Sequence, residues 1–153
     1  MSEYNTYLIT GGAGFLGFHL ARGVAKRGGK SIIYDIAPVD LATYPSGTIY
    51  IKGDVRDRAR FAESLKEVDV VIHAAAALPL ETAKEIYSTN VDGARTVFEE
   101  SQKANIKRVV LVSSTAVYGV PEKHPIFETD PLIGVGPYGE SKLMVEKILT
   151  WYR

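Results

Sequence analysis

The sequence predicts an α/β fold, a doubly wound parallel sheet with helices on both faces. Short runs rich in valine, isoleucine and tyrosine alternate with segments whose apolar residues recur at helical spacing. Several of the short runs are continuously apolar, which is typical of parallel strands covered on both faces. Strand–helix alternation of this kind indicates right-handed crossovers within one parallel sheet.

Each element of this fold has its own signal in the sequence. Strands are expected at residues 6–10, 31–35, 48–52, 68–74 and 108–114. Leu16, Leu20 and Val24 repeat at helical spacing and predict a helix that ends at a pair of glycines. Phe61 and Leu65 indicate a shorter helix, and a longer one is expected over roughly 82–104.

Two segments lack periodicity, residues 36–47 and 117–137. The second contains four of the seven prolines. A stretch of about 20 residues without periodicity is more often functional than idle in a compact domain. We therefore expect 117–137 to be a loop over a pocket, with an exposed connector as the alternative.

Composition narrows the class of protein. The 153 residues fit one domain, and the absence of cysteine excludes disulfides and thiolate metal sites. Eighteen basic residues balance eighteen acidic ones, so nucleic acid is not an expected partner. No apolar run is long enough for a membrane span, and the first strand follows the N-terminus without room for a signal peptide. A cytoplasmic protein is expected. The three histidines, His19, His73 and His124, match no metal spacing, so no metal is expected.

Residues 7–20, YLITGGAGFLGFHL, join the first predicted strand to the first helix through a glycine-rich turn. Gly11, Gly14 and Gly17 lie three apart. An early glycine permits the tight turn, Gly14 lets a pyrophosphate approach the backbone, and Gly17 allows the helix to pack closely on the strand. The helix N-terminus then faces the anion with free N–H groups. A tight turn without a ligand is the alternative.

Asp35 ends the second predicted strand, 18 residues beyond Gly17. A carboxylate there accepts hydrogen bonds from both adenosine ribose hydroxyls. It would repel a 2′-phosphate, and Ile36 supplies no cation beside it. NAD is therefore predicted over NADP, unless Asp35 is only a turn aspartate.

Tyr138 and Lys142 lie four apart in PYGESK, residues 137–142, at a predicted helix start. At this spacing the two side chains share a helix face, where an ammonium stabilises a phenolate. The spacing alone occurs by chance, but VSSTAVYG, residues 112–119, ends the fifth predicted strand. Ligands bind outside such strand ends, and a hydroxyl there could bind the substrate oxygen that Tyr138 deprotonates. A serine that merely caps the next turn is the alternative.

Seven motifs in one order give a resemblance that covers essentially the whole chain: TGGAGFLG, Asp35, GDV at 53–55, HAAA at 73–76, NVDG at 90–93, SSTAVYG and YGESK. Together they resemble the extended short-chain dehydrogenase/reductases, specifically the NAD-dependent epimerase/dehydratase group that acts on nucleotide sugars. The resemblance implies a Rossmann-type fold and NAD as the cofactor.

The resemblance also implies roles for individual residues. The implied catalytic residues are Ser114, Tyr138 as acid/base and Lys142, which also binds the nicotinamide ribose. Asn90 matches an asparagine that stabilises the local active-site architecture. The remaining implied cofactor contacts are Gly11, Gly14 and Gly17 with main chain at Phe15 and Leu16 for the pyrophosphate, Asp35 for the ribose, Asp54 and Val55 for the adenine, and Ala74, Ala75 and Ala76 along the cofactor.

The activity implied is hexose 4-epimerase chemistry on a nucleotide sugar through a transient 4-keto intermediate. Decarboxylase, ketosugar reductase, hydroxysteroid-type dehydrogenase and a non-catalytic NAD-binding module remain open. In the family, sugar 4,6-dehydratases carry Asp-Glu directly after the catalytic Ser/Thr, where this chain has Thr115 and Ala116. The acid and base of that elimination are therefore missing here, and 4,6-dehydratase activity is not expected.

The family is about twice as long as this chain. Residues 1–153 are therefore expected to form a truncated NAD-binding domain that lacks the C-terminal substrate-binding part. A homodimer is expected through the helices near 82–104 and 138–153.

Overall fold

A computed structural model describes residues 4–152. The first three residues, from which we inferred the absence of a signal peptide, lie outside the described residues, as does Arg153 at the end of the predicted dimer helix. The strands are β1 (Thr6–Thr10), β2 (Lys30–Asp35), β3 (Ile49–Lys52), β4 (Val70–His73) and β5 (Arg108–Leu111). The α-helices are α1 (Phe15–Lys26), α2 (Arg58–Ser64), α3 (Ala83–Ile86), α4 (Gly93–Lys103) and α5 (Gly136–Leu149). Short helical turns are η1 (Leu41–Thr43), η2 (Tyr87–Asp92), η3 (Thr115–Tyr118) and η4 (Thr150–Tyr152).

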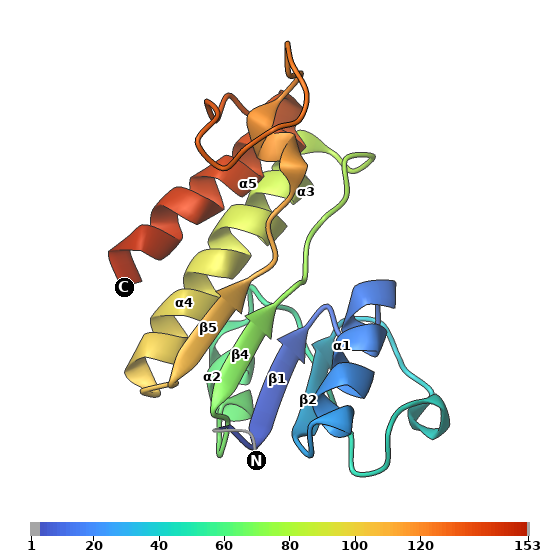
Figure 1. The fold of residues 1–153 in the computed structure, drawn as a ribbon. Coiled ribbons are helices and arrows are strands. Elements are labelled where there is room, and N and C mark those ends of the chain that lie inside the picture. Colours follow the sequence, from blue (N-terminus) through green and yellow to red (C-terminus); the bar gives the residue numbers. More distant parts are fainter. Residues whose placement is uncertain (1–3, 153) are drawn as a thin grey trace.

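The five strands form one parallel sheet in the order β3-β2-β1-β4-β5. The chain runs outward from β1 to β3 on one side and then crosses back to add β4 and β5 on the other (Figure 1). This reversal beside β1 is the topological switch point of a doubly wound sheet. The predicted fold class is confirmed.

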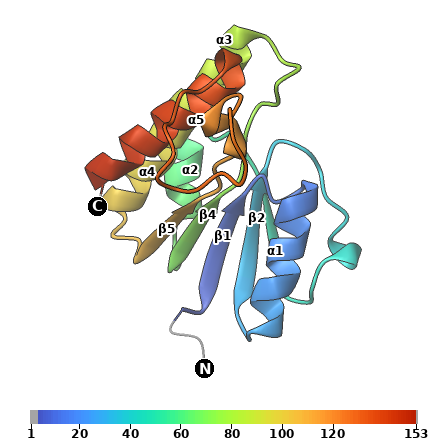
Figure 2. The ribbon, with the colours of Figure 1, turned by 45° about the horizontal axis from the view of Figure 1, so that its top comes forward.

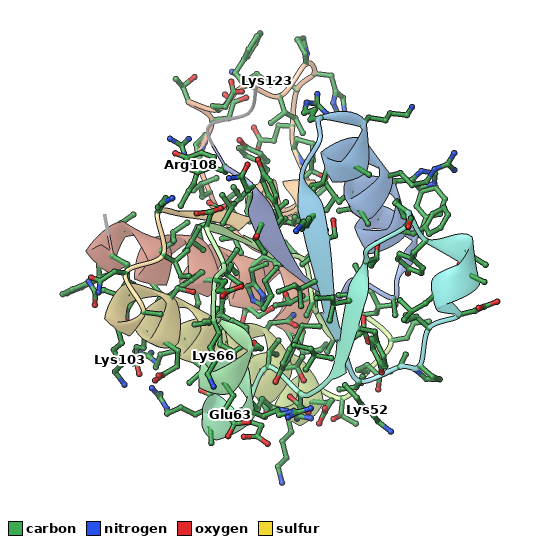
Figure 3. All side chains as sticks on the ribbon, turned by 90° about the horizontal axis from the view of Figure 1, so that it is seen from below. Lys52, Glu63, Lys66, Lys103, Arg108 and Lys123 are labelled. Atoms are coloured by element: carbon green, nitrogen blue, oxygen red, sulfur yellow. The ribbon has the colours of Figure 1, made fainter. Side chains whose placement is uncertain are left out.

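Two apolar layers cover the two faces of the sheet. Successive strand residues point to opposite faces, so Leu8 packs in one layer and Ile9 in the other. Ile9 meets Ala21 of α1, whereas Leu8 belongs to a larger cluster with Phe61 of α2 and Phe98 of α4. Figure 2 shows α1 on one face and α2, α4 and α5 on the other. Figure 3 shows the same layers from below, with Glu63 and Lys103 at the periphery of the thicker layer.

The layer formed by α1 covers only part of its face. α1 packs on β1 and β2, whereas Val110 of β5 lies on that face in register with Ile72 and is 42% exposed. Among residues 4–152, β5 pairs with β4 alone. No helix of this described part is long and apolar enough to cross a membrane.

The predicted long helix over 82–104 differs in detail from the structure. It is divided into α3, a π-helical turn η2 and α4. The extra residue of a π-helical turn rotates the following side chains, and such turns are frequent at functional sites. Strands β4 and β5 are also shorter than predicted. Residues 119–135 are a loop, as expected, and α5 begins at Gly136 with proline in its first turn.

Candidate active site

The carboxyl ends of the strands and the connections that follow them lie at one end of the molecule (Figure 1). The β1–α1 turn, the segment after β4, η3 after β5 and the start of α5 all lie there. Ligands of open parallel sheets bind at this end, beside the switch point. The predicted site residues therefore come from elements that converge on one region.

The glycine turn is shaped by close contacts with its own backbone and with the segment after β4. Gly11 has a φ of +69°, and a Cβ there would lie 2.7 Å from the Ala75 nitrogen. A Cβ at Gly17 would lie 2.4 Å from the Gly12 Cα atom, so only glycine lets α1 pack on the turn. Gly14 starts α1 without a side-chain cap, and the first helical turn holds no acidic residue. Its N–H groups are suited to an anion.

A cavity of about 490 Å³ opens beside this turn. Its lining includes six of the residues that the sequence assigned to the cofactor: Gly11, Asp35, Asp54, Val55, Ala75 and Ala76. The structure therefore brings the three residues predicted for the adenosine together around one space with a glycine predicted for the pyrophosphate and two alanines predicted to lie along the cofactor.

Asp35 is held in place at the rim of this cavity by two main-chain donors. Its Oδ2 accepts a hydrogen bond from Ala13 N at 3.0 Å, and its Oδ1 accepts one from Ala37 N at 2.9 Å. Each carboxylate oxygen has a second lone pair, so both can still accept from a ligand. The carboxylate ties the glycine turn to the segment after β2.

Arg56, which the sequence reasoning missed, also lines the cavity. Its guanidinium contacts Asp54 Oδ2 at 2.6 Å and Glu85 Oε1 at 2.9 Å. The hydrogen bonds from Arg56 hold the pKa of the Asp54 carboxyl below its usual range, although partial burial works against this. The predicted adenine carboxylate is thus ionised and joined to α3.

A buried network fixes the start of the segment after β4. Thr10 Oγ1 accepts hydrogen bonds from Ala74 N and Ala75 N, both at 3.2 Å, and lies 2.8 Å from His73 Nδ1. A hydroxyl has one proton, so this proton is donated to His73 Nδ1. His73 is therefore neutral, with its own proton on Nε2. Burial lowers the pKa of His73 to about 3, with a smaller contribution from the positive charge of Lys142.

Asn90 lies within the π-helical turn and is 2% exposed. Its Oδ1 accepts from Ala77 N at 2.7 Å, and its Nδ2 donates to Ser141 Oγ at 3.0 Å. Ser141 Oγ donates in turn to Tyr138 O at 2.8 Å. Asn90 thereby connects the segment after β4 to the first turn of α5.

Tyr138 and Lys142 share a face of α5, with Lys142 Nζ 5.9 Å from the centre of the Tyr138 ring. Lys142 is 5% exposed and donates to Val112 O at 3.0 Å. Ser114 lies two residues further along, and its Oγ accepts from Ala116 N at 3.2 Å as the cap of η3. α5 approaches this turn closely, since a Cβ at Gly139 would lie 2.7 Å from Ala116 O. These three residues lie outside the lining of the 490 Å³ cavity.

The profile of the NAD dependent epimerase/dehydratase family matches residues 7–153. The chain belongs to this family.

Relatives in sequence and in structure agree with this assignment. The chain is 37% identical over 152 residues to a UDP-glucose 4-epimerase of Lactobacillus helveticus, a match that covers 94% of this chain and 46% of the relative. A Brucella ovis UDP-glucose 4-epimerase in complex with NAD superposes with a TM-score of 0.88 at 32% identity, over 97% of this chain and 47% of that one. A Bifidobacterium longum enzyme of the same name, in complex with NAD⁺ and UDP, gives 0.87 at 34% identity, over 95% and 48%. The chain spans about half the length of these relatives.

Three side chains of this epimerase/dehydratase family member were missed by the sequence reasoning. Thr10 acts through His73, and Arg56 joins its neighbour Asp54 to the distant Glu85, so no local spacing indicates either contact across the fold. Glu146, which accepts a hydrogen bond from the Ser113 hydroxyl, did carry a signal, because it follows Lys142 by one helical turn. Among residues 4–152 no group of three acidic or histidine side chains is placed to hold a metal ion.

Proposed function

We propose that this chain forms the NAD-binding part of a nucleotide-sugar 4-epimerase in which Tyr138 is the acid/base. The observation that supports this most is the shared end of the sheet. The cavity that contains Asp35 and Asp54 opens at this end. The end of β5 and the face of α5 with Tyr138 and Lys142 lie at the same end. In a protein with the length of the relatives, residues 1–153 would be the cofactor domain.

The residues around the cavity fit a dinucleotide. The uncapped start of α1 suits a pyrophosphate, and Asp35 stands where a ribose diol would meet it. The ionised carboxylate of Asp54 would accept from an exocyclic amine. The residues that would hold NAD are Gly11, Gly14, Phe15, Leu16, Gly17, Asp35, Asp54, Val55, Ala74, Ala75, Ala76, Asn90, Tyr138 and Lys142.

Bound NAD would supply the acceptor and then the donor of the hydride at C4 of the sugar, which leaves and returns on opposite faces of that carbon. Tyr138 would take the proton of the C4 hydroxyl while Ser114 donates a hydrogen bond to the same oxygen. The Lys142 ammonium would stabilise the phenolate and bind the nicotinamide ribose. Acid–base catalysis by groups held in this way contributes about 10²–10⁴-fold to a rate. Asn90 would keep the first turn of α5 in place during both transfers.

A nucleotide sugar is proposed as the substrate because the related structures carry UDP and NAD⁺ together. We also propose a homodimer through the helices near 82–104 and 138–153. Met144 is 43% exposed and Trp151 is 85% exposed on this side of the molecule, and apolar side chains exposed in this way favour association.

The test is Tyr138→Phe in a protein with the length of the relatives. Absorbance of the reduced cofactor and epimer formation should fall at least 100-fold, whereas NAD affinity measured by calorimetry should change less than about threefold. Tyr7→Phe is the matched control, since Tyr7 lies near the start of β1, away from the carboxyl ends of the strands, and packs in the layer on the α1 face. Retained turnover in Tyr138→Phe would refute the role.

The chain by itself should bind NAD but produce no reduced cofactor when sugar nucleotides are added. This outcome would separate binding from the complete reaction. Reduced cofactor formed by residues 1–153 would show that the substrate contacts are already present in them.

A further inference from the structure

Two consecutive residues after β5 are each held by a side chain of α5. Val112 O accepts from Lys142 Nζ at 3.0 Å, and the Ser113 hydroxyl donates to Glu146 Oε1. Lys142 and Glu146 lie one helical turn apart, so they form a pair of anchors along one face. Ser114 follows directly. The anchors thus fasten the segment that carries Ser114 to the helix that carries Tyr138.

Lys142 is an ammonium with little solvent around it. Burial lowers its pKa, and the negative charge of Glu146 acts in the opposite direction. Among the described residues no carboxylate lies close enough to form an ion pair with Lys142. The titratable groups that face it are Tyr138 and Glu146 from α5 and His73 from β4. His73 is neutral at physiological pH, so it adds no positive charge.

We propose that Glu146 is a positioning residue of the Tyr138–Lys142 pair. It favours the charged form of Lys142 one helical turn away and holds Ser113, and with it Ser114, against α5. The proposal rests on the proposed function for its catalytic meaning, but its physical content is measurable without turnover. Without Glu146, Lys142 would lose its proton at a lower pH, and the segment 112–114 would have one anchor.

The experiment follows the Lys142 ammonium directly. The chain is labelled with ¹³Cε-lysine, and each methylene signal is titrated by NMR, with Lys142 assigned by the loss of its signal in Lys142→Arg. Glu146→Gln should lower the midpoint of Lys142 by about half a pH unit or more, because a neighbouring opposite charge favours the charged form. Glu146→Asp keeps the charge and should restore most of the shift.

Glu140→Gln is the matched control. Glu140 lies on the same helix, but its carboxylate accepts from the Tyr87 hydroxyl at 2.5 Å, on another side of α5. This variant should leave the Lys142 midpoint within about 0.2 units, since the charge of Glu140 does not contribute to the pKa of Lys142. Equal shifts in Glu146→Gln and Glu140→Gln, or no shift in either, would overturn the proposal.

Ser113→Ala tests the anchor separately from the charge. Amide hydrogen exchange at residues 112–114 should become at least fivefold faster, while the Lys142 midpoint moves less than in Glu146→Gln. Ser113→Thr keeps the hydroxyl and should restore protection. Unchanged exchange in Ser113→Ala would contradict the anchoring role. If Glu146→Gln shifts the Lys142 midpoint but the full-length protein is inactive, only the proposed function is refuted. If turnover depends on Tyr138 but Glu146→Gln causes no shift, only this inference is refuted.

Discussion

Lys142 Nζ donates a hydrogen bond to the main-chain oxygen of Val112 at 3.0 Å, and the Lys142 residue is only 5% exposed. The bond joins α5 to the end of β5 and places a buried positive charge between them. Burying an ammonium without an ion pair costs folding free energy, so a lysine kept in this position indicates that its charge serves another purpose. The arrangement therefore predicts that function and stability oppose each other at this position.

We expect Lys142→Met to leave the free energy of unfolding unchanged or to raise it by about 1 kcal/mol, because the desolvation cost disappears while the apolar stem remains. The lost hydrogen bond to Val112 offsets part of this gain. NAD affinity should nevertheless fall at least tenfold. Urea denaturation and calorimetry measure the two quantities. Lys147→Met changes an exposed lysine of the same helix and should alter neither, and a loss of more than about 2 kcal/mol in Lys142→Met would contradict the argument.

Two glycines of the β1–α1 turn should separate stability from binding. Gly17→Ala places a Cβ 2.4 Å from the Gly12 Cα atom, so backbone must move, and we expect a loss of about 2 kcal/mol or more in unfolding free energy. At Gly14 the nearest atom to a Cβ is Gly11 O at 3.3 Å, and its φ of −79° suits any residue. Gly14→Ala should therefore cost less than about 1 kcal/mol but weaken NAD binding at least tenfold. Thermal unfolding and calorimetry of both variants test this, and equal effects on stability would be inconsistent with it.

The sheet could be predicted from the sequence because its strands are continuous apolar runs separated by helical patterns. The order β3-β2-β1-β4-β5 does not follow from these local patterns, because nothing in them places β4 beside β1 instead of beside β3. The π-helical turn at Tyr87–Asp92 could not be predicted in this way. It depends on where Asn90 meets Ala77 and Ser141, which are brought together only by tertiary packing.

The same distinction applies to the site. Gly11, Gly17 and Asp35 are identified by spacing because a strand, a turn and a helix in succession fix where they lie. The ion pair between Arg56 and Glu85 is different, since Glu85 lies 29 residues away along the chain. Electrostatic partners of this kind become visible only when the elements are packed.

Asp35 should set the preference between NAD and NADP. The amide of Asp35→Asn has only one accepting oxygen, because its nitrogen is a donor. It can therefore keep the hydrogen bond from Ala13 N or the one from Ala37 N, but not both. We expect NAD affinity to fall about tenfold, since a charge-assisted hydrogen bond to the ribose is lost. NADP affinity should fall less or rise, because the repulsion of a 2′-phosphate is relieved. Calorimetry with both cofactors measures the ratio, and Asp92→Asn, at an exposed position of η2, is the control. Tighter binding of NADP than NAD by the unmodified chain would disprove the assignment of Asp35.

His73 should make the fold sensitive to acid. Burial lowers its pKa to about 3 in the folded state, whereas an unfolded histidine titrates near 6.5. Between these values the unfolded chain binds the extra proton, so stability is complete above about pH 6.5 and is lost as the pH falls toward 3. The slope due to this residue approaches 1.4 kcal/mol per pH unit within that window. Protonation would also place a donor opposite the Thr10 hydroxyl and disrupt the bonds to Ala74 and Ala75.

The corresponding variant is His73→Asn, whose oxygen can accept the Thr10 proton but which does not titrate. Urea denaturation between pH 4 and pH 7 should show a slope that is shallower by about one proton than in the unmodified chain, even though the cavity left by the smaller side chain lowers stability throughout. If the unfolding free energy of His73→Asn kept the full dependence on pH, the acid sensitivity would arise from other groups. The prediction that protonation of His73 destabilises the fold would then be wrong.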